Sequence, residues 1–562
     1  MRHLQMPSRR DLIKIAGQTC LVAGIAPIDR ALSTLARPIG VRSINVVNFL
    51  RGVEPRGPVD LFLPLQKQME IILQNRLPAT WLLQFDALVS GPFVEFLKAH
   101  MAKNHEVGIW FEMNEMHCKA AGVDWRGRPG YEWDHFPSVA FTIGYTPEER
   151  IKLADTFMRE FKKVWGFHPK SVASWNLDAI TMAHLTETHR IDAYAVCRDQ
   201  IATDGFTIWG APIAGYYPST TNCWSPALSR DKQISTPVFR MLGQDPVYYY
   251  QHDHPTPDGR RGGGPDTMEP VWSSGRSPIF IKNFLRMIAE SPALRFAYAQ
   301  LGQENNFGWP DMAGAYPIQM KALAEMREHN MVHVETMGES GRRFKQAFTE
   351  TPAQAQVMLE DPFGNPEPGE RSVWYQSRFY RANLHFRGDL PYLRDLTVYS
   401  DQNPQPFLNQ ATRSHDVEQR MPAVLDGYHW SRTPGSPEPG AGGFFIMDGQ
   451  RLRVTGKPFV REDGNSLAVE LLVTDGRTLH VKFEEKEFSV WISPAAKTPL
   501  TLSFEWDSSR AAFVEIRPLR IAYRWQHFDY SVGLRGTART TAEGWSATED
   551  RGPIMLEMAQ SV

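Results

Sequence analysis

Residues 171 to 178 read Ser-Val-Ala-Ser-Trp-Asn-Leu-Asp, a short β-like run that ends in polar and acidic side chains. A helical stretch follows it, and the same succession of strand, polar ending and helix recurs from about residue 41 to residue 345. Short strands that alternate with longer helices are typical of parallel strands joined by crossover helices. The sequence therefore predicts an α/β fold in which this segment is one strand of a (β/α)7-type parallel barrel.

Seven segments have the length and apolar content of buried strands. They are residues 43–48, 80–85, 106–111, 171–175, 193–198, 237–241 and 295–301. Amphipathic segments between or after these strands carry apolar residues at three-to-four spacing, as helices do. They are residues 60–75, 92–103, 147–165, 277–290 and 317–328. We therefore assign residues 39–350 to a catalytic barrel.

Polar or acidic residues stand at the ends of several predicted strands. They are Gln84, Asp86, Glu112, Asp178, Asp199, Asp245, Gln303 and Glu304. The carboxyl ends of parallel barrel strands lie at one face, where the active sites of such barrels are built. A single carboxylate at such a position often caps the next helix, but a recurring series favours a shared pocket. We expect these side chains to converge there.

Asp178 and Glu304 are the predicted catalytic residues. Hydrolysis of a glycosidic bond uses two carboxylates, one as nucleophile or base and the other as acid. Asp178 follows Trp175, and Glu304 stands shortly before Trp309. Tryptophan offers a flat apolar face with a polar edge, a surface on which sugar rings stack. We therefore expect Trp175 and Trp309 to bind substrate beside the two acids.

Further substrate-binding residues are predicted around the same face. Asp86 and Glu112 end the second and third strands, and Arg198 and Asp199 follow the fifth. Arg51 and Glu54 follow the first strand. Planar carboxylate and guanidinium groups match pairs of sugar hydroxyls. Two structural explanations account for these residues equally well. Arg198 and Asp199 could bond each other within a turn, and the charges of Arg51 and Glu54 could form a surface salt bridge.

Two short motifs resemble glycoside hydrolase family 57. Trp175-Asn176-Leu177-Asp178 is similar to the Trp-Leu-x-Glu nucleophile strand of that family, with Asp178 in place of the glutamate. The segment from Gln303 to Trp309 resembles its late Asp-x-Glu and Phe-Gly motif, with Glu304 one residue from the aligned position. The chain also resembles the wider group of seven-stranded barrels that includes alpha-mannosidase-like enzymes and polysaccharide deacetylases. Some bacterial proteins of unassigned activity join such a barrel to a β domain, which this resemblance implies here too.

The pattern of predicted elements changes after Val357. Residues 361–369 read as a turn or linker rich in Pro and Gly, and alternating β-like runs follow. The expected strands are residues 372–379, 444–447, 467–473, 479–483, 488–492 and 500–505. The alternation predicts a β-sandwich, so we assign residues 351–562 to a β-rich C-terminal domain.

Residues 1–38 are predicted to form a twin-arginine signal peptide. Ser8-Arg9-Arg10-Asp11-Leu12-Ile13-Lys14 matches the export pattern, and a weakly apolar stretch too short to span a bilayer follows it. No later segment has the ~18 uninterrupted apolar residues that a membrane helix needs. We therefore expect the mature protein to be periplasmic or secreted, without a membrane span.

The residues favour an exported glycoside hydrolase whose partner is a carbohydrate substrate. A net charge of -2 gives no indication of the basic surface that binds nucleic acid. No cofactor is predicted, because the chain lacks a phosphate loop and a dinucleotide fingerprint. The oligomeric state is left open.

A metal-dependent polysaccharide deacetylase is one alternative, and a noncatalytic glycan-binding protein is another. The runs Val47–Gly52 and Gly108–Glu112 lack the Asp-Asp pair and the His-x-x-x-His that the deacetylase resemblance implies. His252-Asp253-His254 is the one plausible metal cluster, although a solvated loop explains it better. No metal ligand is therefore assigned.

Overall fold

The computed structural model describes residues 40–251, 266–366, 369–495 and 497–559, and the backbone of 254–255 and 261–262. The chain divides into two compact units, Met1–Arg37 and Pro38–Val562, and all described residues belong to the second. The predicted signal peptide and the side chains of His252, Asp253 and His254 lie outside the described residues. The export route and this metal cluster therefore stay predictions.

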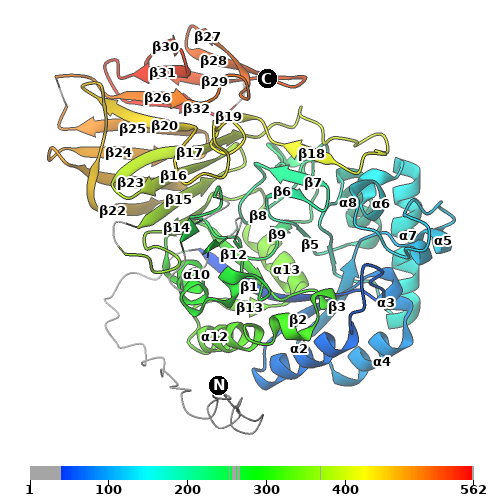
Figure 1. The fold of residues 1–562 in the computed structure, drawn as a ribbon. Helices are drawn as coiled ribbons and strands as arrows, with labels where there is room; N and C mark the ends of the chain where they lie inside the picture. The colour runs from blue at the N-terminus through cyan, green and yellow to red at the C-terminus, as the bar shows by residue number, and fades with distance from the viewer. Residues whose placement is uncertain are drawn as a thin grey trace, which may run out of the picture. The chain divides into compact units, whose positions relative to one another are not determined.

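A curled parallel sheet forms the N-terminal part of this unit (Figure 1). Its strands follow the order β12-β1-β2-β3-β4-β5-β9, so strands that succeed one another along the chain are neighbours and β12 returns beside β1. Their bounds are β1 (Val41–Leu50), β2 (Ala79–Leu83), β3 (His105–Trp110), β4 (Ser171–Ala173), β5 (Ala193–Val196), β9 (Val238–Arg240) and β12 (Phe296–Leu301). Each strand predicted for the barrel is confirmed. The short strands β13 (His333–Glu335) and β8 (Gly215–Tyr216) extend the sheet beside β1 and β9.

The barrel is open between β9 and β12. Among the residues that the structure describes, no hydrogen-bonded ladder joins these two strands. Aromatic side chains meet across the gap instead: Phe239 of β9 stacks on Tyr298 of β12, with ring centroids 4.6 Å apart, and also contacts Phe296. The sheet is thus held to its barrel curvature by side-chain packing at this side.

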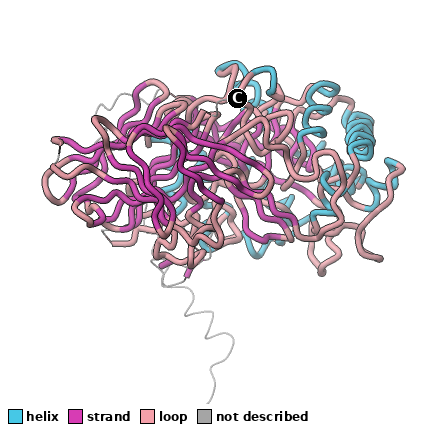
Figure 2. The backbone as a smooth tube through the Cα atoms, turned by 90° about the horizontal axis from the view of Figure 1, so that it is seen from above, coloured by secondary structure: helices cyan, strands magenta, loops and turns pink. Residues whose placement is uncertain are grey.

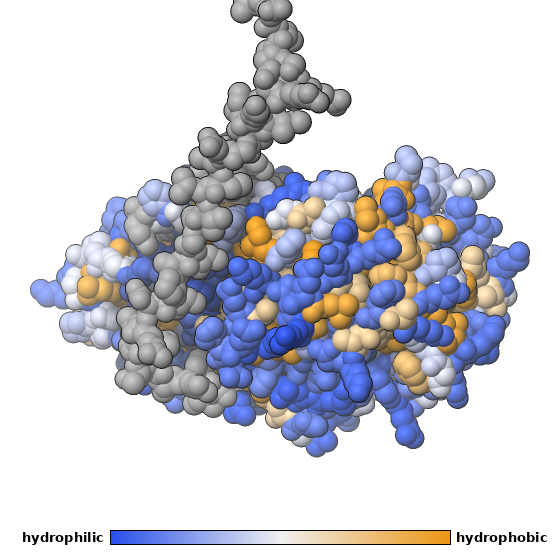
Figure 3. All heavy atoms as spheres, turned by 90° about the horizontal axis from the view of Figure 1, so that it is seen from below, coloured by the Kyte–Doolittle hydropathy of each residue, from blue (hydrophilic) through white to orange (hydrophobic). Residues whose placement is uncertain are grey.

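The helices cover the outside of the sheet and confirm the predicted amphipathic segments. These are α2 (Phe62–Gln74), α4 (Gly91–His100), α7 (Pro147–Trp165), α10 (Pro278–Glu290) and α12 (Tyr316–Glu328). Helix α7 begins at a capping box, in which Thr146 and Glu149 bond each other's backbone N–H, and Pro147 occupies its first turn. Its buried face includes Leu153 and Phe157. The face seen in Figure 3 is largely hydrophilic with scattered apolar side chains, as expected for amphipathic surface helices.

Shorter helices fill the connections between strands and helices. They are α3 (Phe85–Val89), α5 (Glu115–Ala121), α6 (Pro137–Ala140), α8 (Ala179–His189), α9 (Ser273–Arg276), α11 (Trp309–Met312) and α13 (Met337–Ala347). None of the described helices has both the length and the apolar character that crossing a membrane requires.

The C-terminal part is a β-sandwich of two antiparallel sheets, as predicted (Figures 1 and 2). One sheet follows the order β14 (Gln354–Met358), β15 (Glu370–Gln376), β16 (Tyr380–Arg387), β17 (Leu390–Val398), β20 (Gly442–Met447), β26 (Thr501–Glu505), β31 (Gly544–Thr548) and β30 (Thr537–Thr541). The other follows β22 (Val454–Asp463), β23 (Ser466–Val473), β24 (Thr478–Phe483), β25 (Glu487–Ser493), β32 (Ile554–Glu557), β29 (Phe528–Arg535), β28 (Arg520–Trp525) and β27 (Phe513–Arg517). Side chains along β23 alternate between buried and exposed positions, which is the period of a sheet with one face in the core.

Segments of the C-terminal half also pack on the barrel. Strand β18 (Val417–Arg420) pairs in parallel with β7 (Phe206–Trp209), and β6 (Gln200–Thr203) completes this small sheet. Arg150 of α7 donates to the backbone carbonyls of Phe407, Leu408 and Gln410. The predicted division into residues 39–350 and 351–562 therefore stays a prediction.

Candidate active site

Two glycine-containing turns position the first acidic groups at the carboxyl ends of β1 and β12. Gly302 ends β12 with a φ of 120°, and a Cβ there would lie 1.9 Å from the carbonyl oxygen of Val47. Only glycine permits this close approach of the two strands, and the chain then turns to present Glu304. After β1, the N–H of Gly52 donates to Asp86 Oδ2 at 3.0 Å. Residues from separate strand ends thus meet at one face of the barrel, as predicted.

Arg51 joins two carboxylates at this face. Its Nη1 lies 2.5 Å from Glu112 Oε2, and its Nη2 lies 3.0 Å from Glu304 Oε2. The side chain of Asn305 holds Arg51 in place by bonding both its backbone N–H and its backbone carbonyl, each at 2.9 Å. The indole ring of Trp133 covers the guanidinium at 4.0 Å. Glu112 and Glu304 therefore approach one another from β3 and β12 around a single buried cation.

The electrostatics of this group are set mainly by burial. Glu112 is fully buried and Glu304 is 6% exposed. Burial, with smaller contributions from Glu112 and Glu269, raises the pKa of Glu304 to about 7 despite the opposing effect of Arg51. Burial also raises the pKa of Glu112, and Arg51 offsets part of that rise. The site therefore holds a carboxyl group that exchanges its proton near neutral pH, which is the property of a general acid.

Asp86 and Glu54 lie near Glu112 and Glu304, and their pKa values are shifted in opposite directions. Burial raises the pKa of Asp86 to about 6, although backbone N–H groups donate to it. For Glu54, burial is outweighed by hydrogen bonds from Arg56 and Asn306, which lower its pKa to about 2. Glu54 is thus a permanently ionised partner of Arg56 at 2.7 Å, in line with the salt-bridge explanation. Asp86 borders the reactive group.

Glu269 is a member of the site that the sequence did not reveal. Its Oε1 accepts from Gln303 Nε2 at 3.4 Å, and its Oε2 accepts from Thr267 Oγ1 at 2.9 Å. Arg198 Nη2 lies 3.7 Å from Glu269 Oε2, so the predicted Arg198 reaches the site through this carboxylate. Glu269 stands in an irregular segment far along the chain from any predicted strand end. Only its tertiary contacts identify it.

Several buried polar atoms at the same strand ends have no hydrogen-bond partner within the described structure. They are both amide atoms of Gln84 and both amide atoms of Asn176. Buried polar groups are nearly always hydrogen-bonded, so a cluster of exceptions indicates a place for water or a ligand. Trp175 lies beside them, partly exposed, with its ring edge-on to Trp110 at 5.4 Å. Trp309 is also partly exposed and begins α11.

Asp178 occupies a different setting. It is the N-cap of α8, and its Oδ1 accepts from the N–H of Thr181 at 3.0 Å. Its Oδ2 accepts from Thr181 Oγ1 at 2.5 Å, and Arg150 Nη1 lies 3.2 Å from Oδ1. No described hydrogen bond, ion pair or ring contact links Asp178 to Glu304. The catalytic role of Asp178 stays a prediction, and the contacts favour Glu112 as the partner of Glu304.

Asp199 ties the barrel to the β-sandwich. Its Oδ1 lies 2.8 Å from Arg240 Nη2, and its Oδ2 lies 2.8 Å from Nη1 of Arg381 on β16. Arg381 also pairs with Asp395 at 2.8 Å. Burial is outweighed by Arg381 and Arg240, which hold the pKa of Asp199 below its usual value. The contacts thus give Asp199 a structural task, and its predicted contact with substrate stays a prediction.

A small cavity lies beside Arg198, between the barrel and the β-sandwich. Its volume is about 30 Å³, and its lining includes Arg240, Tyr249 and Trp374. A water molecule needs roughly 10–15 Å³ on this measure, so the cavity holds about two waters and not a sugar ring.

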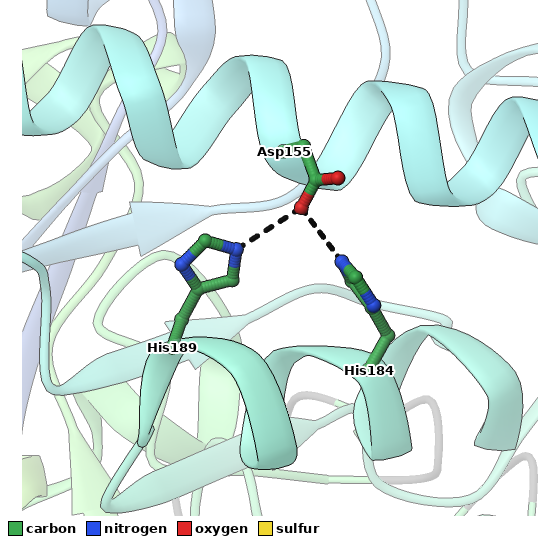
Figure 4. A group of neighbouring side chains, drawn as sticks. All are labelled: Asp155, His184 and His189. Carbon is green, nitrogen blue, oxygen red and sulfur yellow. Dashed lines mark hydrogen bonds and ion pairs between the residues drawn. The ribbon is translucent and has the colours of Figure 1, made fainter.

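The strand ends do not offer the donor set of a mononuclear metal centre. In the described part of the chain, the one group of three or more His, Cys, Asp or Glu side chains close enough to share an ion is Asp155, His184 and His189, on α7 and α8 (Figure 4). A catalytic zinc usually takes at least one imidazole or thiolate. The groups that meet around Arg51 are carboxylates only, so they do not fit an Asp-His-His centre.

Comparison with known proteins identifies the fold. No protein-family profile and no curated protein match the chain. A candidate glycoside hydrolase/deacetylase of Parabacteroides distasonis has a solved structure that matches with a TM-score of 0.50 and 14% identity, covering 72% of this chain and 94% of that one. A candidate polysaccharide deacetylase of Mycobacterium smegmatis matches with a TM-score of 0.30 and 14% identity over 57% of this chain and 97% of its own. The first likeness supports the predicted barrel fold, and the resemblance to glycoside hydrolase family 57 stays a prediction.

Proposed function

We propose that the protein is an exported carbohydrate-active hydrolase that cleaves a glycosidic bond, with Glu304 as general acid and Glu112 as the second carboxylate. One observation carries this proposal. The two carboxylates, one after β3 and the other after β12, reach the same guanidinium, that of Arg51. Hydrolysis of a glycosidic bond needs two carboxyl groups near one another, and Arg51 holds this pair together.

The protonation states suit the reaction. A glycosidase needs one carboxyl group that is protonated at working pH and one that is ionised. With a pKa of about 7, Glu304 holds a proton in a large fraction of molecules at neutral pH. Burial raises the pKa of Glu112 as well, but Arg51 lies closest to this group and opposes that rise through a hydrogen-bonded ion pair, which favours its ionised form. Proton donation by Glu304 to the leaving oxygen then leaves the new charge beside Arg51.

The surroundings support a sugar as substrate. The unpartnered amide groups of Gln84 and Asn176 offer both donors and acceptors, as vicinal hydroxyls require. The ring of Trp175 adds an apolar surface beside them. The fold is compatible with this chemistry because it is shared with a candidate glycoside hydrolase/deacetylase. Fold alone does not select a reaction, so the residues carry the assignment.

The test is a screen of the purified protein against oligosaccharides and aryl glycosides, with and without chelator. We expect turnover that is insensitive to chelator and falls at least ~10²-fold in Glu304→Gln and in Glu112→Gln. The matched control is Glu106→Gln, because Glu106 lies on the same strand as Glu112 but at its opposite end, bonded to Ser171 and Gly338. Full activity in Glu304→Gln would overturn the assignment.

The same screen separates the two alternatives. A deacetylase is equally compatible with the fold likeness, and it would release acetate from acetylated saccharides in a reaction that chelator stops. A glycan-binding protein would bind saccharide without any turnover by the wild-type chain. Either result would replace the glycosidase proposal.

Export by the twin-arginine route is the second part of the proposal, and it depends on Arg9 and Arg10. Replacing both by lysine in the full chain is expected to retain the protein in the cytoplasm. A tagged twin-arginine reporter whose export continues normally serves as control. Unchanged appearance of the variant outside the cytoplasm would rule out this route.

A further inference from the structure

Two helices on the outside of the barrel bring a carboxylate and two imidazoles together. Asp155 lies in the middle of α7, His184 lies in the middle of α8, and His189 is the last residue of α8. His184 Nε2 is 2.6 Å and His189 Nε2 is 3.1 Å from the same oxygen, Asp155 Oδ1. Figure 4 shows both rings directed at that oxygen. The three groups converge although they come from different helices.

We propose that Asp155, His184 and His189 bind a divalent transition ion of the zinc type. Imidazole nitrogen and carboxylate oxygen are ligands that zinc prefers, and the three candidate ligand atoms all lie within 4.8 Å of one another. Zinc binds such atoms at about 2.0–2.2 Å, so small side-chain rotations suffice to enclose the ion. This site lies on the outer helices, away from Arg51, Glu112 and Glu304.

A third imidazole lies next to these three groups. The ring of His168 is 5.4 Å from the ring of His189, and His168 Nδ1 is a buried atom without a hydrogen-bond partner. Structural zinc sites take four protein ligands, and His168 is the neighbouring imidazole that a rotation of its side chain could bring in as the fourth. Thr188 Oγ1 lies 3.4 Å from His184 Nδ1, so an outer partner orients the ring that would bind through Nε2.

The exposure of the cluster suits an exchangeable ion. The side chain of Asp155 is 44% exposed, that of His184 20% and that of His189 13%. An ion can therefore enter from solvent, while the imidazoles are held by their helices. Because α7 and α8 flank β4, an ion at this point would fasten together the two helices on either side of that strand. Its expected contribution is to stability.

The test is calorimetric titration of untagged, metal-stripped full chain with zinc chloride. We expect one equivalent to bind to the wild type, with the affinity at least tenfold weaker in Asp155→Asn and in the double variant His184→Gln/His189→Gln. His100→Gln is the matched control, because His100 is an exposed helix residue that bonds only to a carbonyl of its own helix. Equal affinity and stoichiometry in wild type and double variant would overturn the proposal.

Two further measurements keep the proposal testable if a variant folds poorly. The melting temperature of the wild type is expected to rise with zinc concentration, because a ligand that binds the folded state stabilises it. Crystals of the wild type soaked in zinc chloride should give an anomalous peak between Asp155 and His184. A peak elsewhere, or none, would exclude the site, and this result is independent of the activity assigned to Glu304.

Discussion

Replacing Glu304 by glutamine is expected to stabilise the folded protein at alkaline pH. The pKa of Glu304 is about 7 in the folded chain against 4.5 for the free group, chiefly because of burial. Between those two pH values the folded state holds a proton that the unfolded state has released, so the free energy of unfolding falls as the pH rises. The stability of the wild type is therefore not reduced by Glu304 below pH 4.5, and it is reduced by the full amount above about pH 7.

The size of the effect follows from the same two values. At about 1.4 kcal/mol for each pKa unit, the rise from 4.5 to about 7 corresponds to about 3 kcal/mol. Glutamine resembles the protonated acid in shape and lacks its charge. Glu304→Gln should therefore unfold with a free energy about 3 kcal/mol higher than the wild type at pH 8, and the difference should shrink to about 1 kcal/mol or less at pH 5.

Urea unfolding followed by tryptophan fluorescence and circular dichroism at pH 5 and pH 8 measures this difference. Glu54→Gln is the control of opposite sign, because the pKa of Glu54 is lowered to about 2 by hydrogen bonds that outweigh its burial. That variant should lose stability at pH 8. If Glu304→Gln is no more stable than the wild type at pH 8, or if the difference does not depend on pH, the reasoning about the buried acid is wrong.

Three other predictions follow from the contacts. Asp178→Asn keeps a side chain that caps α8 but leaves Arg150 without its buried counter-charge. The variant should lose about 3 kcal/mol of stability in urea unfolding and keep its turnover. Loss of turnover with unchanged stability would instead assign Asp178 to catalysis. Arg381→Met removes a shared counter-charge from two buried aspartates, Asp199 and Asp395, and should lower the free energy of unfolding by about 3–5 kcal/mol. A change below 1 kcal/mol would contradict this prediction. With Glu304 as acid, kcat/KM should fall as the pH rises above about 7, and a flat profile up to pH 9 would exclude that role.

The barrel and sandwich were predictable because their signals are local. Each barrel strand is a short apolar run buried on both faces, and α7 is announced by Thr146, Pro147 and Glu149 within four residues. The alternation along β23 likewise indicates a sheet with one solvent face. The small sheet of β6, β7 and β18 was not predicted, because β7 and β18 are about 200 residues apart in the chain and neither carries a strong pattern of its own.

The sequence predicted where the acidic side chains meet, and only in part which of them meet there. Strand ends correctly indicated Arg51, Glu112 and Glu304 as neighbours, because the parallel barrel brings all such ends to one face. The same signal could not separate them from Asp178, whose partner Arg150 comes from the preceding helix. A strand-end carboxylate looks alike in sequence whether it meets a substrate or a cation from elsewhere in the fold.

What distinguishes the two kinds of carboxylate is whether their oxygens are already used. In the structural networks every oxygen has a partner: both oxygens of Asp178 accept bonds, and Asp395 is bonded by Arg381, Thr397 and Tyr250. Around Arg51 the balance is different, because one guanidinium serves two glutamates. Burial, with smaller contributions from Glu112 and Glu269, raises the pKa of Glu304 and destabilises the folded state at neutral and alkaline pH, a condition that persists in proteins where the buried group has a function. We therefore propose that Glu112 and Glu304 carry the chemistry and that Asp178 and Asp199 hold the barrel in place, which the opposite stability effects of Glu304→Gln and Asp178→Asn test directly.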